Sequence, residues 1–361
     1  MWFLKHILNS TLKPGRGKRI FVGVSGGVDS SVSALLLKLY GYDVTGVFIR
    51  TWQPEWTPCT WRDERRDAMR VCAHLDIPFI ELDLEKEYKQ GVADYMITEY
   101  KKGRTPNPDV MCNREVKFGG FLKWALETGA DYVATGHYAQ NISDQLVKGI
   151  DESKDQSYFL WTLTQKQLNT ILFPIGHMQK RNVRKLASWY KLPTAIKKDS
   201  QGICFIGEID MKDFLKHYID EKSGNVINEQ NEVIGRHNGV LLYTLGERHG
   251  FTIIEKGTRD LPYYIIKKDI KQNILVVSQT INVVKGVQKI ELIDCVWRGI
   301  PTKKSYTAQI RYHGDFKTCT LNKTEKNTYT VVFDYLDTTI APGQSVVVYD
   351  HSVCIGGGIV A

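Results

Sequence analysis

The sequence predicts an α/β protein with an N-terminal doubly wound parallel sheet, a small central domain and a C-terminal antiparallel β-barrel. Ahead of residue 205, short β-rich runs alternate with amphipathic segments of helix length, which is the pattern of βαβ units. Beyond that point glycine-rich turns and short alternating runs take over. From Ile290 onward nearly every segment has the character of a strand, at the spacing of a small barrel.

Length and composition agree with several globular domains. The chain has 361 residues, and at roughly 150 residues per domain this predicts two or three. With 42% hydrophobic and 24% charged residues, collagenous, low-complexity and largely disordered proteins are excluded. No apolar run approaches the ~18 residues that a helix needs to span a bilayer, so we do not expect this chain to be a membrane protein. The expected divisions are a basic extension at 1–18, a nucleotide domain at 19–208, a central domain at 209–282 and a barrel at 283–361.

The charge balance favours a polyanionic partner only weakly. There are 48 Lys and Arg against 40 Asp and Glu, a net charge of +8. The first 19 residues hold five of these cations and no acid. They are either a short organellar presequence or a basic extension that touches RNA. The second interpretation is favoured, so the predicted location is cytoplasmic, with mitochondrial as the alternative.

The cysteines indicate a reducing compartment. The seven cysteines are odd in number and widely spaced, and no secretory segment precedes them. No CxxC pair occurs, which argues against a structural zinc or an iron–sulfur cluster, so no tightly bound metal or cluster is expected. The positions are 59, 72, 112, 204, 295, 319 and 354.

A first βαβ unit is predicted from the spacing of apolar residues. Arg19–Val24 has the composition of a buried strand, Ser30–Tyr40 has apolar residues at helical spacing before Gly41, and Asp43–Ile49 is a second strand. The alternation continues with a helix at Arg62–Leu75, a strand at Phe79–Leu82, helices within Val92–Lys102 and Glu115–Glu127, and a strand at Asp131–Thr135.

Later elements are mostly short strands. One more helix is predicted at Met211–Ile219. The expected strands are Tyr263–Lys267, Ile274–Val277, Ile290–Val296, Tyr306–Tyr312, Thr328–Phe333, Ser345–Tyr349 and Val353–Ile355.

The segment Gly23–Ser30 (GVSGGVDS) connects the first strand to the first helix. Its glycines let backbone N–H groups approach an anion, and the helix N-terminus adds a favourable dipole. The lysine of a Walker A loop is missing. An ordinary glycine-rich turn is the alternative, disfavoured by the strand before and the helix after.

This loop resembles the SGGxDS signature of the PP-loop family, which splits ATP between its α- and β-phosphates and transfers AMP to a carbonyl oxygen. Asp29 is expected to help hold Mg²⁺ against the phosphates. Gly136 follows the carboxyl end of a parallel strand, where nucleotide approaches closely. The ATP contacts that the resemblance implies are Gly23, Val24, Ser25, Gly26, Gly27, Val28, Asp29, Ser30, Ile49 and Gly136.

Two cysteines stand in polar segments rich in Gly or Pro. Cys112 follows Gly103–Met111, and Cys204 follows Lys198–Ile203. A cysteine in a loop or at a helix start can act as a thiolate. Taken singly, each is as well explained by a structural role.

Together with the loop, these segments resemble the tRNA-specific 2-thiouridylase (MnmA) family. The resemblance extends from residue 19 to the C-terminus. Further matching blocks, in the family's order, are Thr135–Ala139, Lys154–Leu160, Tyr243–Arg248, Arg311-Tyr312 and Pro342–Gln344.

The resemblance implies that sulfur replaces the 2-oxygen of the wobble uridine after ATP has adenylated that oxygen, and AMP is released. Cys204 would carry a persulfide delivered by a cysteine desulfurase or a sulfur-relay protein. Cys112 would be the nucleophilic partner, either assisting attack or closing a Cys112–Cys204 disulfide bond. Asp109 is the candidate acid/base or base-positioning group, with a turn aspartate as the alternative.

The implied partner is tRNA, bound by a chain that we expect to be a monomer. Asn107, Pro108 and Asp109 would face the target base, which lies in a single-stranded loop. His137 is either a tRNA contact or a core histidine bonded to a backbone carbonyl. The implied tRNA contacts are Asn107, Pro108, Asp109, His137, Lys154, Asp155, Gln156, Arg311, Tyr312 and Gln344.

The sequence disfavours three other functions. Another PP-loop enzyme that adenylates a carbonyl is disfavoured by the two loop cysteines, because amide ligation needs no sulfur carrier. A non-catalytic RNA-binding relative is disfavoured by the intact loop. A metal-binding redox protein is disfavoured by the scattered cysteines.

Overall fold

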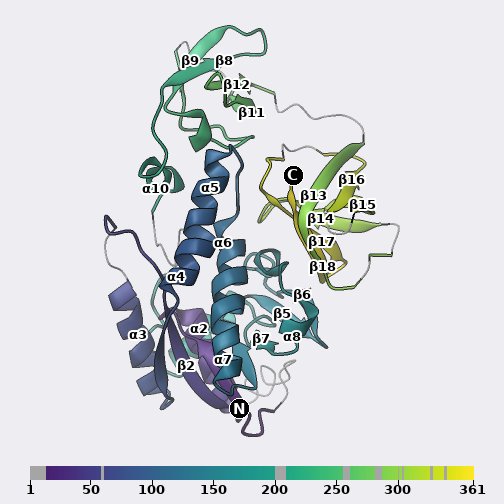
Figure 1. Ribbon diagram of the computed structural model, residues 1–361. Coiled ribbons are helices and arrows are strands. Elements are labelled where there is room, and N and C mark those ends of the chain that lie inside the picture. Colours follow the sequence, from purple (N-terminus) through teal and green to yellow (C-terminus); the bar gives the residue numbers. More distant parts are fainter. Residues whose placement is uncertain are drawn as a thin grey trace.

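The computed structural model shows a parallel sheet, a small antiparallel-rich sheet and a barrel (Figure 1). It describes residues 14–57, 61–199, 209–254, 261–280, 287–299, 301–302, 305–325, 328–336 and 340–361.

The N-terminal sheet confirms the predicted doubly wound fold. Its five strands have the order β3-β2-β1-β4-β7, and every pair is parallel. The order reverses at β1, which pairs with β2 on one side and β4 on the other. The elements are β1 (Arg19–Gly23), α2 (Val28–Leu39), β2 (Asp43–Arg50), α3 (Trp61–His74), β3 (Phe79–Asp83), β4 (Tyr132–Ala134), β7 (Ile171–Leu172) and α9 (Lys180–Trp189).

Two long composite helices rise from this sheet toward the central domain (Figure 1). One is α4 (Glu85–Tyr88), η1 (Lys89–Asp94) and α5 (Tyr95–Lys101); the other is α6 (Pro108–Met111), η2 (Cys112–Phe121) and α7 (Leu122–Glu127). The middle part of each is π-helical.

The second composite helix begins earlier than the sequence predicted. Glu115 was the expected start, but α6 begins at Pro108. The Asn107 side chain accepts hydrogen bonds from the backbone N–H groups of Asp109 and Val110, both at 3.1 Å. An Asn at the N-cap followed by Pro at the first helical position is a strong start signal, and the polar composition hid it.

A hairpin that the sequence analysis missed joins two domains. It consists of β5 (Ala139–Ile142) and β6 (Gln145–Lys148), and Ser143 and Asp144 turn it with φ of 51° and 62°. β6 pairs with the barrel strand β18 through Val147 and Val353. The segment that follows contains η3 (Ser157–Leu160) and α8 (Gln165–Leu168).

The C-terminal barrel is confirmed. Six strands run in the order β13-β16-β15-β14-β17-β18, and pairing between β13 and β18 closes the ring. The strand β15 was not predicted, because its sequence KTCTLNKTE is mostly polar. The barrel strands are β13 (Gln288–Trp297), β14 (Tyr306–Gln309), β15 (Lys317–Glu325), β16 (Thr328–Phe333), β17 (Ser345–Asp350) and β18 (Val353–Val360).

The central domain is a five-stranded sheet with the order β10-β9-β8-β12-β11. Its elements are α10 (Met211–Lys216), β8 (Gly224–Ile227), β9 (Val233–His237), η4 (Val240–Leu242), β10 (Thr252–Ile253), β11 (Tyr264–Asp269) and β12 (Ile274–Ser278).

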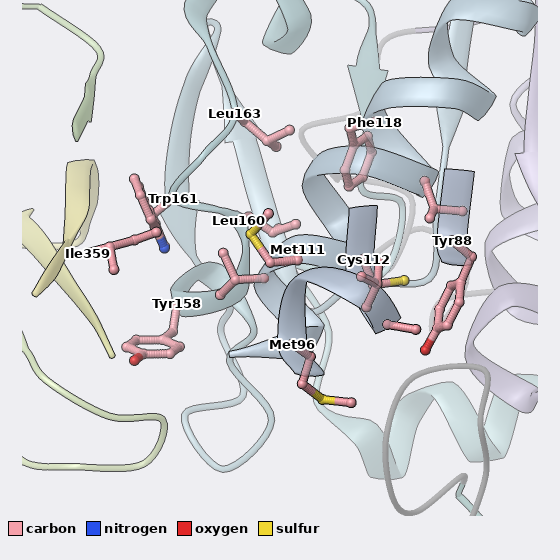
Figure 2. Close-up of a cluster of buried hydrophobic side chains, with 14 of the residues drawn as sticks. Tyr88, Met96, Met111, Cys112, Phe118, Tyr158, Leu160, Trp161, Leu163 and Ile359 are labelled. Atoms are coloured by element: carbon pink, nitrogen blue, oxygen red, sulfur yellow. The ribbon is translucent and has the colours of Figure 1, made fainter. Parts of the chain in front are cut away.

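One buried apolar cluster ties the three parts together. It includes Phe121 of the N-terminal domain, Leu275 of the central sheet and Ile359 of the barrel. The composite helices therefore serve as the common core against which both later domains pack (Figure 2). Within the described part of the chain, no helix has the length and apolar character needed to cross a membrane.

Candidate active site

A cavity of 530 Å³ opens where β1 and β4 end. This is the point at which the strand order reverses, where open α/β sheets bind their ligands. The walls combine the predicted ATP loop, residues that follow β4, the start of the second composite helix and Tyr312 of the barrel segment. Four segments that are far apart in the sequence therefore face one space.

The loop between β1 and α2 is shaped to receive an anion. The Ser25 and Ser30 hydroxyl oxygens lie 3.2 Å apart, and the Ser25 N–H donates to Ser30 Oγ at 3.2 Å. Gly27 is the N-cap residue of α2 and makes no side-chain capping bond. The first-turn residues Val28, Asp29 and Ser30 line the cavity, at the positive end of the helix dipole.

An ion network that the sequence analysis missed lies beside this loop. Lys180 Nζ donates to both oxygens of Asp29, at 2.8 and 2.7 Å, and lies 2.8 Å from Asp199 Oδ1. The Tyr138 hydroxyl donates to Asp29 Oδ1 at 2.7 Å. Burial, together with the neighbouring Asp29 carboxylate, raises the pKa of Tyr138.

Asp199 is the hub of the same network. Lys154 Nζ lies 3.3 Å from Asp199 Oδ2, and Arg184 also donates to this carboxylate. Burial alone would raise the pKa of Asp199, but the bonds and charges of Lys180, Lys154 and Arg184 outweigh it and lower the pKa. Asp199 follows the Lys197-Lys198 pair, and this polar run was the one signal that could have drawn attention to it.

The proposed catalytic residues differ in their exposure. Asp109 lines the cavity, one helical turn before Cys112. Cys112 is fully buried at 0% exposure, among apolar side chains such as Met111 and Tyr88 (Figure 2). Cys204 lies outside the described residues.

The polar sequence around Cys112 is thus a poor guide to its surroundings. The helix that begins at Pro108 turns Asp109 and Asn113 toward the cavity and Cys112 toward the core. Asp109 and Asn113 are four residues apart and therefore share the face that lines the cavity, whereas Cys112 lies to one side of that face, and composition does not reveal this difference. Cys112 lies directly behind the cavity wall.

Comparison with known proteins adds the family. Models described as tRNA methyl transferase HUP domain, tRNA methyl transferase PRC-barrel domain and aminomethyltransferase beta-barrel domain match residues 18–208, 212–279 and 287–360. The tRNA-specific 2-thiouridylase MnmA of Alkaliphilus oremlandii is 45% identical over 96% of this chain and 98% of its own length. The chain belongs to the MnmA family. It is therefore an enzyme of the sulfurtransferase class.

One further curated protein and one solved structure are also similar to this chain. The MnmA 2-thiouridylase of Francisella philomiragia is 44% identical over 96% of this chain and 99% of its own length. Among solved structures, the U34-tRNA thiolase NcsA from Methanococcus maripaludis aligns with a TM-score of 0.37 and 16% identity, covering 53% of this chain and 64% of that chain.

Of the residues that the MnmA resemblance assigns to ATP, those of the loop line the cavity except Gly26, which faces α3. Ile49 at the end of β2 also lines it. Gly136 packs against the loop itself, because a Cβ there would lie 2.7 Å from the Ser30 backbone nitrogen. Any side chain at 136 would push α2 away from β4.

The residues that the MnmA resemblance assigns to tRNA fall into two groups. His137, Lys154, Gln156 and Tyr312 line the cavity together with Asp109. The others do not line it. Asn107 caps α6, Pro108 is its first residue and Arg311 is exposed. Asp155 accepts hydrogen bonds from its neighbours, and Gln344 Oε1 accepts from the Ala341 N–H at 3.1 Å.

Asp155 has a structural environment. It accepts from the N–H groups of Gly149 and Ser157 at 2.9 and 3.0 Å, and from the Ser157 hydroxyl at 2.9 Å. Burial raises the pKa of this carboxyl although these bonds oppose it. Asp155 therefore holds the Lys154–Gln156 turn in place.

The segment before α6 touches the other two domains. Thr105 N donates to the Pro342 carbonyl of the barrel at 2.7 Å, and the Thr105 hydroxyl lies 3.2 Å from that of Thr244 in the central domain. Arg104 donates to the Val360 carbonyl at 2.9 Å. Both later domains thus hold the residues that lead into Asn107 and Asp109.

His137 is buried at 6% exposure and lies at the cavity wall. Its Nδ1 is 2.7 Å from the Thr135 hydroxyl, and its Nε2 is 3.5 Å from Lys117 Nζ. An ammonium can only donate, so Nε2 is the acceptor and Nδ1 carries the proton. Burial, and then the Lys117 charge, hold the pKa of His137 well below its usual 6.5.

This environment predicts a pH-dependent stability. The unfolded chain binds a proton at His137 near pH 6.5, whereas the folded chain does not. The free energy of unfolding should therefore fall below about pH 6.5, by up to about 1.4 kcal/mol per pH unit from this group. Urea unfolding between pH 5 and 8 measures it. His137→Gln should flatten the slope, and His351→Gln, at an exposed position, should not. Equal slopes in wild type and His137→Gln would contradict the expectation.

Proposed function

We propose that this protein uses ATP to replace the 2-oxygen of the wobble uridine in tRNA anticodons by sulfur. The observation that carries the proposal is the shared cavity, in which the Ser25–Ser30 loop, Asp109 and Tyr312 face one another. The backbone N–H groups of the loop can bind the phosphates of ATP. Asp109 can hydrogen-bond a nucleobase, and the ring of Tyr312 can stack on that base. The relatives at 43–45% identity are 2-thiouridylases, which supports tRNA as the substrate.

The proposed chemistry begins with ATP as a substrate. The uridine 2-oxygen attacks the α-phosphorus, and pyrophosphate leaves. A urea-like carbonyl is a poor electrophile and oxide a poor leaving group, and adenylation corrects both deficiencies. The terminal sulfur of a Cys204 persulfide then forms a bond to C2, and the C2–O bond breaks as AMP departs.

The transferred sulfur is still bonded to Cys204 at this point. The Cys112 thiolate attacks the Cys204 sulfur, so the bond to the transferred sulfur breaks and a Cys112–Cys204 disulfide forms. A dithiol reductant supplies two electrons to restore both thiols. This step needs the two Cα atoms within about 4.4–6.8 Å. Because Cys112 lies in the core, we infer that the helix wall around it must move to admit the second sulfur.

Mg²⁺ fits the loop as a companion of ATP. Among the residues described, no group of three or more His, Cys, Asp or Glu could hold a metal ion by itself. Mg²⁺ takes most of its ligands from phosphates and water, with one or two carboxylates from the protein. Asp29, at the cavity wall in the first turn of α2, would hold the ion and place its charge against the phosphates. No tightly bound cluster forms part of the proposal.

The base and its tRNA would be held by residues around the cavity. Asn107 and Pro108 start the helix that presents Asp109, which would donate or accept a proton at the base. Lys154 and Arg311 suit phosphate, and Tyr312 would stack on an unpaired base. The sulfur would come from a cysteine desulfurase or a relay protein. We propose further that the protein is a monomer and that it acts in the cytoplasm.

The decisive experiment is nucleoside mass spectrometry of tRNA after incubation with the protein, ATP, Mg²⁺ and a persulfide donor. We expect 2-thiouridine, and we expect it to be lost when ATP is omitted. A tRNA with the wobble uridine replaced by cytidine is the control and should stay unmodified. Hydrolysis of ATP to AMP and pyrophosphate without a thiolated nucleoside would overturn the sulfur assignment.

Phosphate contacts should make tRNA binding sensitive to salt. Each phosphate neutralised by Lys or Arg releases a counterion, so log Kd varies linearly with log salt concentration with a slope of about 0.7 to 0.9 per contact. We expect tRNA affinity to fall at least about tenfold between 50 and 200 mM KCl, since two or more contacts lose that much. Arg311→Ala should reduce the slope by about one contact. A flat salt response, measured by filter binding, would contradict binding through phosphates.

A further inference from the structure

The nucleotide loop lacks the lysine that a Walker A loop carries. Its residues Ser25–Ser30 include one charged side chain, the carboxylate of Asp29. A carboxylate beside a polyphosphate is repulsive unless a cation lies between them. The Mg²⁺ that Asp29 would hold supplies part of this positive charge, and any side-chain cation must come from another part of the fold.

Lys180 occupies that position. It is the first residue of α9, far from the loop in sequence, and its side chain is only 14% exposed. The cavity wall includes it, and its Nζ contacts both oxygens of Asp29. Lys154, which also lines the cavity, is 41% exposed and bonds Asp199 instead.

We propose that Lys180 is the phosphate-binding lysine of this ATP site and takes the β- and γ-phosphates as its partners when nucleotide binds. The inference rests on the proposed use of ATP. It assigns the cation that the SGGVDS loop does not itself contain.

The network is built so that Lys180 can change partners at low cost. Asp199 keeps Lys154 and Arg184 when Lys180 leaves it, so this half-buried carboxylate is not left unpaired. Asp29 keeps the Tyr138 hydroxyl and gains freedom to hold Mg²⁺. Lys180 thus separates two carboxylates in the absence of ATP and neutralises phosphate in its presence. On cleavage, the same ammonium would stabilise the charge that develops on pyrophosphate.

The test compares ligands that differ only in their phosphates. Binding of ATP, inorganic pyrophosphate and adenosine to wild type, Lys180→Met and Lys180→Arg is measured by calorimetry in the absence of tRNA. We expect Lys180→Met to weaken ATP and pyrophosphate at least about tenfold and to leave adenosine unchanged, because methionine keeps the length but not the charge. Lys180→Arg should stay within a fewfold of wild type.

Lys197→Met is the matched control. Lys197 forms a Lys–Asp pair of the same length, 2.7 Å to Asp67, and is not part of the cavity wall. It should leave all three affinities unchanged. If Lys180→Met does not fold, Lys180→Gln replaces it, since glutamine can still donate to both carboxylates without a charge.

Two results would overturn the inference. One is wild-type affinity for ATP and pyrophosphate in the uncharged variant. The other is an equal loss of ATP and adenosine, which would mean that Lys180 only holds the cavity open. Neither result depends on sulfur transfer, so a failure of the proposed thiolation would leave this test intact.

Discussion

Replacing Cys112 by alanine is expected to lower 2-thiouridine formation at least about a thousandfold while ATP still binds with wild-type affinity. A thiolate is by far the strongest nucleophile available at neutral pH, and a methyl group cannot replace it. Cys204→Ser should have the same effect. Nucleoside mass spectrometry measures the product, and calorimetry measures ATP binding.

Burial of Cys112 makes a matched control necessary. Removing a buried side chain can disturb packing irrespective of chemistry. Cys72, in α3, is equally buried at 1% exposure, and burial raises the pKa of its thiol to about 11, so it is a poor nucleophile. Cys72→Ala should lower stability comparably but keep full activity. Full activity in Cys112→Ala or Cys204→Ser would exclude the persulfide scheme.

Gly26→Ala is expected to weaken ATP binding by about two orders of magnitude, equivalent to roughly 2.7 kcal/mol. Gly26 has a φ of +71°, and a Cβ there would lie 2.5 Å from the Glu64 carbonyl oxygen of α3. Because that neighbour is backbone, the loop must shift away from α3 and lose its shape. Calorimetric titration with ATP measures the change.

Gly41→Ala separates this effect from backbone strain. Gly41 follows the same helix, has a φ of +79° and has no atom within 4 Å of an added Cβ. Both variants carry the cost of a left-handed residue, roughly 1–2 kcal/mol of stability. Gly41→Ala should lose that stability and keep its ATP affinity. Unchanged ATP affinity in Gly26→Ala would show that the loop does not need its present shape.

Local signals accounted for much of the fold and for part of the site. The glycine-rich turn between β1 and α2 indicated a phosphate-binding loop because it connects a strand to the N-terminus of a helix. The alternation of strands and helices predicted the parallel sheet. In that sheet Gly23 and Thr135 lie at the carboxyl ends of their strands, at the same edge. The strand β15 escaped because its inward positions include few large apolar side chains, so its period is weak.

Local signals failed where a residue depends on the phase of a helix. Cys112 and Asp109 belong to one motif in the sequence, yet one is in the core and the other at the cavity wall. The Asn107 cap sets the phase of the helix that separates them. Composition around a cysteine cannot supply this information.

The sequence by itself determined the glycine-rich loop between the first strand and the first helix, the order of the domains and the family to which the chain belongs, because each is encoded in contiguous motifs. Only the tertiary structure decided which cation faces Asp29, since Lys180 comes from a helix 151 residues further along the chain. It also decided that the barrel and the central domain both hold Thr105, which stands just ahead of Asn107 and Asp109. Such contacts form when elements that are distant in the sequence pack together and bury apolar surface. The sequence next to either residue does not reveal a contact of this kind.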